Sequence, residues 1–211
     1  MNTPLRRYVA GVACAVLLTG AAACTSGPSK PSSRPSPSAP ASTGASATMT
    51  SKPVPLTVRV TRVSGKLNVQ ERKALAANVG RAISGYFDAA YLSGDYPRSD
   101  FAHAFPTFTA GAARQAAHDE TLLTNASLGP STQSVTAKKQ SAYLSVLAPY
   151  KVAAGVDAHV ELVYVADRGD KPAKRVTVTG RLTLTRKKSG GWQIFGYHIA
   201  RSATDETKGA S

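Results

Sequence analysis

The sequence predicts an α+β domain in which N-terminal helices pack on a bent antiparallel sheet of about four strands, with one further strand before the helices. Apolar residues recur every four positions at Leu75, Val79, Ile83 and Phe87, which indicates a long amphipathic helix. From Thr132 onward the apolar period changes to two, as in strands with one buried face. Short breaks between these strands favour antiparallel hairpins, and helices followed by such a meander indicate the α+β class.

The first expected strand covers residues 56–63, where apolar and polar residues alternate until Ser64-Gly65. The main helix is expected to begin at Asn68, because Asn68 and Glu71 have the spacing of a capping box. Gly94 is expected to end this helix as a C′ glycine does.

Two shorter helices and four strands complete the prediction. Ser99 is expected to cap a short helix that runs through Phe105 and ends at Pro106, and Thr109 to cap a third helix that reaches Leu123. The four strands are expected at residues 132–148, 156–167, 174–187 and 191–201. If the sheet bends strongly, a cone-shaped cavity would lie between the sheet and the helices.

The first 24 residues have the pattern of a secretory signal. Arg6 and Arg7 precede an apolar stretch up to Ala23, which is too short for a comfortable membrane span of about 20 residues. Gly20 to Cys24 resembles a bacterial lipobox, although Ala21 stands where that motif prefers leucine. The resemblance implies that Cys24 receives a lipid and becomes the mature N-terminus. The arginine pair also partly resembles a twin-arginine export signal, so export by the general or the twin-arginine route stays open.

Residues 25–55 are predicted to be a disordered linker and residues 202–211 a disordered tail. The linker holds seven of the thirteen prolines, nine serines and no aromatic residue, so it cannot bury enough apolar area to fold. Its proline content makes it a semi-stiff spacer, and a stalk that threads the cell wall or carries sugars is the alternative. The folded domain, residues 56–201, contains no cysteine, because Cys14 and Cys24 are the two in the chain. A disulfide and a thiolate metal site are therefore excluded there.

The net charge of +14 does not by itself predict a nucleic-acid partner. The cations are spread along the sequence, and the densest run is Arg186-Lys187-Lys188. No basic stripe is combined with exposed aromatics on which bases could stack, so we expect no nucleic-acid binding. A solvated basic surface, or contact with anionic lipids or wall polymers, remains as the explanation.

The order of elements resembles the nuclear transport factor 2-like superfamily, also called cystatin-like or SnoaL-like, over about residues 68–201. The segment Gly191–Tyr197, with sequence GWQIFGY, looks like the closing strand of that superfamily, and the helix carrying Tyr86-Phe87-Asp88 looks like its opening helix. The strand at 56–63 departs from the pattern. Members include isomerases and dehydratases with an Asp or His base inside the cone, and non-enzymatic accessory domains of envelope proteins.

Candidate site residues follow from this resemblance and from the local pattern. We expect the interior of the cone to be lined by Tyr86, Phe87, Tyr91, His103, Phe105, Trp192 and Tyr197. Asp95, Arg98 and Asp100 form the tightest charged cluster, and they are predicted either to fix a turn as an ion pair or to form the rim of the cone. Asp157, His159 and Glu161 share a strand face that is expected to be exposed to solvent. The four histidines lack the spacing of ligands, so neither a metal nor another cofactor is expected.

The expected function is that of a lipoprotein anchored on the extracytoplasmic face of the cell membrane, with a non-enzymatic binding or accessory domain. Its partner would be an envelope protein or a small apolar ligand. The alternative is a small-molecule enzyme of the isomerase or dehydratase kind that acts inside the cone. An enzyme needs a deep pocket with a perturbed acid or base, whereas an accessory domain needs only a filled interior.

Overall fold

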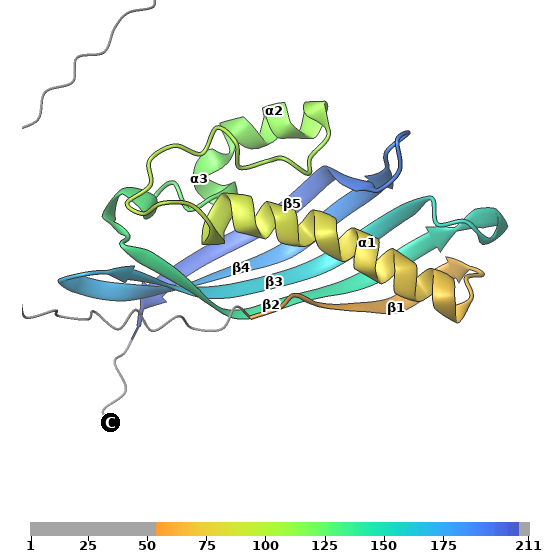
Figure 1. Cartoon of the computed structure of the whole chain (residues 1–211), viewed down its shortest axis with the longest axis horizontal. Coiled ribbons are helices and arrows are strands. Elements are labelled where there is room, and N and C mark those ends of the chain that lie inside the picture. Colours follow the sequence, from red (N-terminus) through yellow and green to blue (C-terminus); the bar gives the residue numbers. More distant parts are fainter. Residues whose placement is uncertain (1–53, 207–211) are drawn as a thin grey trace, which may run out of the picture. The chain divides into compact units, whose positions relative to one another are not determined.

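The computed structural model describes residues 54–206, so the predicted signal peptide, most of the linker and the end of the tail lie outside the described residues. One layer of helices covers one face of a single sheet (Figure 1). The helices are α1 (Val69–Phe87), which continues as a π-helical turn (Asp88–Leu92), α2 (Ala110–His118) and α3 (Glu120–Leu123). The strands are β1 (Thr57–Gly65), β2 (Ser134–Ala148), β3 (Gly155–Arg168), β4 (Lys171–Arg186) and β5 (Trp192–Asp205).

The α+β class is confirmed, but the predicted sheet needs correction. The five strands form one open mixed sheet in the order β1-β2-β3-β4-β5. Strands β2 to β5 are the expected antiparallel meander, whereas β1 pairs in parallel with β2. The helices between β1 and β2 form the long crossover connection that parallel neighbours require. The first strand is therefore an edge strand of the sheet and not a separate element.

Helix α1 begins as predicted. The Asn68 side chain accepts a hydrogen bond from the Glu71 amide, and the Glu71 carboxylate accepts one from the Asn68 amide, both at 2.8 Å. This reciprocal pair satisfies two amides that the first helical turn leaves without partners. At the other end Gly94 follows the C-cap Ser93 with a φ of +113°, a conformation that favours glycine. Both predicted boundaries of the main helix are confirmed.

The predicted helix from Ser99 to Phe105 is wrong, because this segment is a series of turns. The Asp100 carboxylate accepts a hydrogen bond from the Ala102 amide at 2.8 Å. Such a local side-chain bond offers the backbone an alternative to the helix. Thr109 caps the next helix as predicted, with its hydroxyl oxygen accepting from the Ala112 amide, but the helix is interrupted at Asp119.

Strand β5 continues beyond the predicted limit at residue 201, so the first residues of the predicted tail are part of the sheet. Lys174 of β4 lies opposite Asp205, and Arg175 lies opposite Thr204. The Lys174 ammonium contacts the Asp205 carboxylate at 2.8 Å, and Arg175 binds Glu206 through two bonds of 2.7 Å. The polar composition of this segment gave no signal of a strand. The segment pairs nevertheless, because β4 offers a long edge with complementary charges.

Candidate functional site

The space between the helices and the sheet is filled by side chains. Tyr86, Phe87 and Tyr91 have no exposed surface, and Tyr164 of β3 is equally buried beneath them. Their rings pack edge to face or tilted, with centroids 5.7 Å apart for Tyr86 and Tyr91 and 6.0 Å apart for Tyr91 and Tyr164. The place where the superfamily resemblance implies a cavity is therefore occupied by the aromatic core itself.

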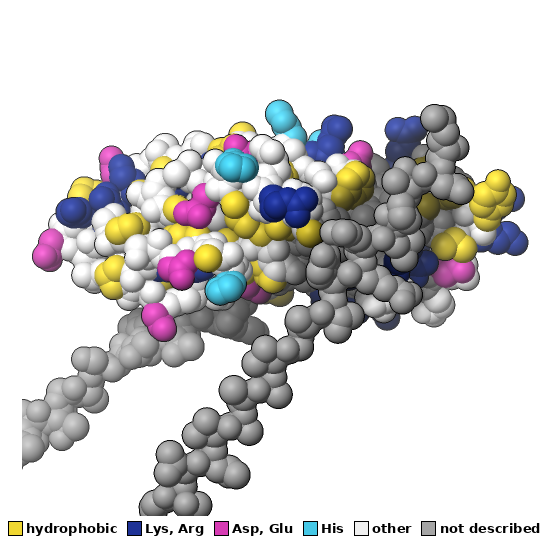
Figure 2. Space-filling model, turned by 90° about the horizontal axis from the view of Figure 1, so that it is seen from above, with side chains coloured by type: hydrophobic (Ala, Val, Ile, Leu, Met, Phe, Trp, Pro, Cys, Tyr) yellow, Lys and Arg dark blue, Asp and Glu magenta, His cyan; other side chains and the backbone are white. Residues whose placement is uncertain are grey.

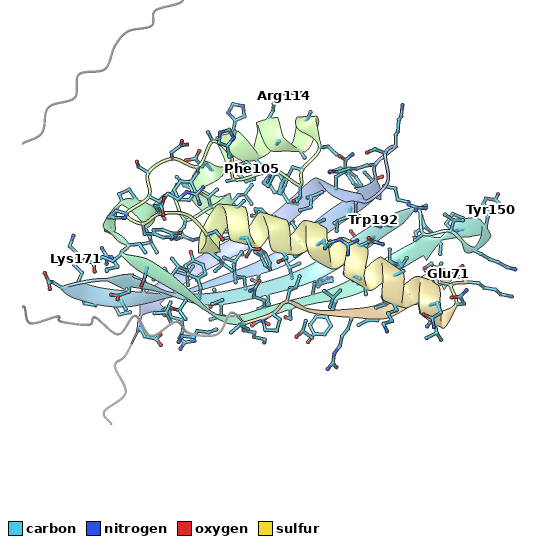
Figure 3. All side chains as sticks on the ribbon, viewed as in Figure 1. Glu71, Phe105, Arg114, Tyr150, Lys171 and Trp192 are labelled. Atoms are coloured by element: carbon cyan, nitrogen blue, oxygen red, sulfur yellow. The ribbon has the colours of Figure 1, made fainter. Side chains whose placement is uncertain are left out.

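The remaining predicted lining residues divide into three groups. Phe105 and Tyr197 are partly buried and pack against Phe108, with ring centroids 5.1 and 6.1 Å away. Trp192 is 7 % exposed and lies beside the first half of α1, where it borders a groove with Leu75 (Figure 3). It therefore packs closer to the start of α1 than to Phe87.

His103 is exposed in the turn segment, so its predicted place in the interior is wrong, because the helix that would have carried it inward does not form.

The buried tyrosine hydroxyls all have hydrogen-bond partners, in two separate groups. The Tyr86 hydroxyl donates to the Leu123 carbonyl at 2.9 Å and lies 3.1 Å from the Tyr91 hydroxyl. The Tyr164 hydroxyl donates to the Asn125 side-chain oxygen at 2.8 Å. Burial raises the pKa of Tyr86 and Tyr91 well above the ordinary value, and it raises the pKa of Tyr164 to about 12. These phenols stay neutral and tie the helices to β3.

Among residues 54–206 no carboxylate or histidine lies inside the domain, where it could act as a catalytic acid or base. Every Asp, Glu and His of this range is at least partly exposed. The partly exposed Asp119 carboxylate accepts a hydrogen bond of 2.7 Å from the Tyr197 hydroxyl at the border of the core. Desolvation, followed by this contact with Asp119, raises the pKa of Tyr197 to about 12. Within the described residues no group of three or more metal-ligating side chains comes together.

In the predicted cluster of Asp95, Arg98 and Asp100, the Arg98 side chain binds backbone carbonyls and not the two carboxylates. The Arg98 guanidinium donates to the carbonyls of Ala89, Ser93 and Asp100 at 2.8 to 2.9 Å. It also lies 4.1 Å from the centre of the Phe101 ring, which is a cation–π contact. Asp95 and Asp100 are exposed, and among the described residues neither carboxylate forms an ion pair with Arg98. Arg98 therefore fixes the end of the π-helical turn and the loop after it.

The open face of the sheet, opposite the helices, carries a row of cationic and aromatic side chains. Arg59, Tyr143, His159, Arg181 and His198 are direct neighbours in the strand pairing and cross all five strands. All five are exposed, and a guanidinium nitrogen of Arg181 lies 3.5 Å from Nε2 of His159. At about 4.8 Å per strand the row is roughly 19 Å long. We call these five residues the cross-strand row.

A groove of about 600 Å³ lies on this open face, beside the cross-strand row. Its charged and apolar lining includes Arg62, Leu147, Asp157, His159, Arg181 and Phe195. Leu147 and Phe195 are 56 % and 50 % exposed and line the same groove. The groove therefore offers both charge and apolar contact to a partner, and it is the candidate functional site.

Sequence reasoning placed Asp157, His159 and Glu161 on the solvent face, and the structure has them there. Glu161 forms an ion pair of 2.7 Å with Lys139. The other groove residues were missed, because the strand pairing alone brings Arg62, Arg181 and Phe195 from three distant segments together. One signal was available: Tyr143 and Leu147 are large apolar residues at the outward positions of an alternating strand.

Comparison of the chain with protein-family models, with curated proteins and with solved structures gave no match. Over residues 54–206 no helix combines the length and the hydropathy that a membrane crossing requires.

Proposed function

We propose that the protein is a lipoprotein anchored through Cys24 on the extracytoplasmic face of the cell membrane, and that its domain is a non-enzymatic accessory module. The module binds an envelope partner through the groove on the open face of the sheet. The observation that carries this proposal is the position of the free space: the aromatic core fills the interior, while the groove lies on the opposite face.

The composition of the groove suggests the chemistry of the partner. Arg62 and Arg181 provide cationic contacts, whereas Leu147 and Phe195 provide apolar ones. An interface needs an apolar centre together with charges that fix the orientation. We therefore propose a protein segment that presents acidic and apolar side chains, in preference to a small apolar ligand.

The relationship to the nuclear transport factor 2-like superfamily is also a proposal. It is supported by the order of a long first helix, two short helices and a four-stranded antiparallel meander. The parallel strand β1 is an addition to that arrangement. The isomerase or dehydratase alternative has no observation in its favour, because the described interior contains no buried carboxylate or histidine.

Site-specific photo-crosslinking in cells tests the groove. A photoreactive residue at Phe195 should give a protein adduct of discrete mass, and the Arg181→Glu substitution should abolish it. The matched control is the same residue at Arg114, which is exposed on α2 on the helical side (Figure 3). Adducts of equal yield at both positions, or none at Phe195, would contradict the proposal.

A further inference from the structure

Three connections of the chain meet at one end of the domain. Gly65 at the end of β1 pairs with Ala148, and Leu147 pairs with Gly155 across the β2–β3 hairpin. Residues of all three connections line one groove, among them Leu67, Lys151 and Arg186. We call residues 65–73, 147–154 and 186–191 together the hairpin end. Figure 3 shows Tyr150 at this end, far from Lys171 at the opposite end of the sheet.

Exposed apolar side chains gather at the hairpin end. Seven large hydrophobic residues of the described range are exposed, and four of them lie here: Val69, Tyr150, Val152 and Leu147, the last of which also lines the groove on the open face. Tyr150 is 97 % exposed and Val69 is 79 % exposed, so neither side chain contributes to the core. Single exposed apolar residues are ordinary on protein surfaces, whereas such a concentration marks an interaction site.

The same end is strongly basic. It contains seven Lys and Arg residues and a single acidic residue, Glu71. The Glu71 carboxylate is already bound to the Asn68 amide in the helix cap. Within the described part of the chain, none of the seven cations takes part in a salt bridge. Figure 2 shows basic and hydrophobic side chains together at this end, on the right of the view.

The backbone at the apex of the β2–β3 connection is unusual. Tyr150 and Lys151 have φ angles of +54° and +62°, in the left-handed region that asparagine and glycine adopt most easily. Large side chains occupy both positions despite this conformational cost. Such strain is found where the position of a side chain matters for function. Here it places an aromatic ring and a lysine next to each other at the most exposed point of the hairpin.

We propose that the hairpin end is a docking surface for the headgroups of an anionic phospholipid bilayer. Tyr150 and Val152 enter the interfacial region, while the surrounding lysines and arginines contact the lipid phosphates. An aromatic residue with a polar tip, flanked by cations on long aliphatic stems, is the combination that such an interface accommodates. A hairpin end with six excess positive charges over its three connections fits a flat anionic surface better than it fits a cleft.

The proposal rests on the proposed anchor for its membrane, and the length of the chain allows both contacts at once. Val54 lies thirty positions after Cys24, which is enough to span roughly 90 Å at about 3.1 Å per residue. Strand β1 then runs from near Val54 to the hairpin end, a path of only about 30 Å. The anchor and the hairpin end can therefore reach one bilayer, which would lay the domain against the membrane.

A fluorescence experiment with the chain of residues 25–211 tests the contact without the anchor. This chain contains no cysteine, so Val152→Cys can carry a single environment-sensitive probe. With vesicles of phosphatidylglycerol and phosphatidylcholine we expect a blue-shifted and brighter emission, and with phosphatidylcholine alone no change. The matched control is Lys171→Cys at the opposite end, whose probe should stay unchanged. Equal responses at both positions, or none at position 152, would overturn the proposal.

Vesicle affinity separates local contact from general attraction. Lys151→Gln should weaken binding about fivefold, since one cation near an anionic surface contributes roughly that factor. Lys171→Gln removes the same charge far from the hairpin end and should leave the affinity unchanged. Tyr150→Ala should weaken binding without changing the net charge. An equal loss for Lys151→Gln and Lys171→Gln would overturn the proposal.

The vesicle-binding result does not depend on the groove or on the lipid anchor. Arg181→Glu lies in the groove and should not affect the probe at position 152. Failure of groove crosslinking or of lipidation would leave a positive vesicle result valid. In cells, a photoreactive residue at Val152 should capture lipid. Capture of a discrete protein instead would overturn the assignment to a bilayer.

Discussion

At the scale of single residues, buried tyrosines determine the chemistry of the interior. Tyr86, Tyr91 and Tyr164 carry hydroxyls into the core, and the Arg201 guanidinium lies close to Tyr164 and donates to the same Asn125 oxygen. Each hydroxyl has a hydrogen-bond partner, and the Asn125 side chain accepts the bond from Tyr164 of β3. A buried polar group is tolerated only when it is paired in this way. These bonds therefore orient the rings that fill the interior.

Phe87→Ala should lower the melting temperature on the order of 10 °C. The ring is completely buried, and truncation to alanine in a core costs about 3–5 kcal/mol because a cavity is left. Calorimetry measures the shift, and Phe195→Ala is the control, since Phe195 is half exposed and should change little. A shift of less than a degree or two for Phe87→Ala would favour a hollow, ligand-binding interior.

Stability should fall as the pH rises from about 10 to about 12. The folded-state pKa of Tyr164 is raised to about 12 by burial, so the folded protein holds this proton where the unfolded chain loses it. The stabilisation is present below pH 10 and is lost as the pH approaches 12, by on the order of 2 kcal/mol. Urea unfolding at several pH values measures it. Tyr164→Phe should have a shallower pH dependence, and an unchanged slope would contradict the assignment.

At the scale of elements, hydrogen bonding to the neighbouring strand β4 determines how far β5 extends. Residues 202–205 are exposed and, apart from Ala203, polar, so no apolar face identifies them as a strand. They pair with residues 174–177 of β4, so their backbone groups complete the ladder. The ion pair of Arg175 with Glu206 is exposed and adds little. The backbone ladder is the larger contribution.

Two truncations test this view. Removal of residues 207–211 should leave the free energy of unfolding within about 0.5 kcal/mol of the full chain. Removal of residues 202–211 should lower it by on the order of 1–3 kcal/mol, because β4 loses its ladder partners. Denaturant unfolding of both chains measures the difference. Equal stabilities would show that the end of β5 does not contribute to the sheet.

Charge and shape give the whole molecule two different faces. The helices cover one side of the sheet, while the open side carries the cross-strand row and the groove. The described residues hold 20 of the 26 basic residues and all 12 acidic ones, a net charge of +8. Part of this excess lies at the hairpin end. An anionic membrane nearby would therefore orient the domain as well as attract it.

Cys24→Ala should release the protein from the membrane fraction. The signal and the small residues before Cys24 imply lipidation of its thiol, and a lipid chain contributes about 0.8 kcal/mol per buried CH₂ to membrane binding. Fractionation at high salt measures retention, since salt screens attraction by the hairpin end. Mass spectrometry of the wild-type protein should find a diacylated N-terminal cysteine. Equal retention of Cys24→Ala would contradict the anchor.

Local patterns were sufficient to predict several elements. The capping box at Asn68, the stripe of α1 and the alternation of β2 to β5 each depend on neighbours within a few residues. The short helix after Ser99 was predicted wrongly because the turn bonds of Asp100 compete with the helix. The lipobox at Cys24 is a sequence prediction that lies outside the described residues.

The sequence by itself determined the α+β class, the main helix and the antiparallel meander, because periodicity and capping act over short distances along the chain. Only the tertiary structure decided that β1 joins the sheet in parallel and that β5 reaches Asp205. It also decided that aromatic rings fill the interior and that Arg62, Arg181 and Phe195 share a groove on the open face. These features depend on strand register and on packing between segments far apart in sequence, and no local pattern encodes either.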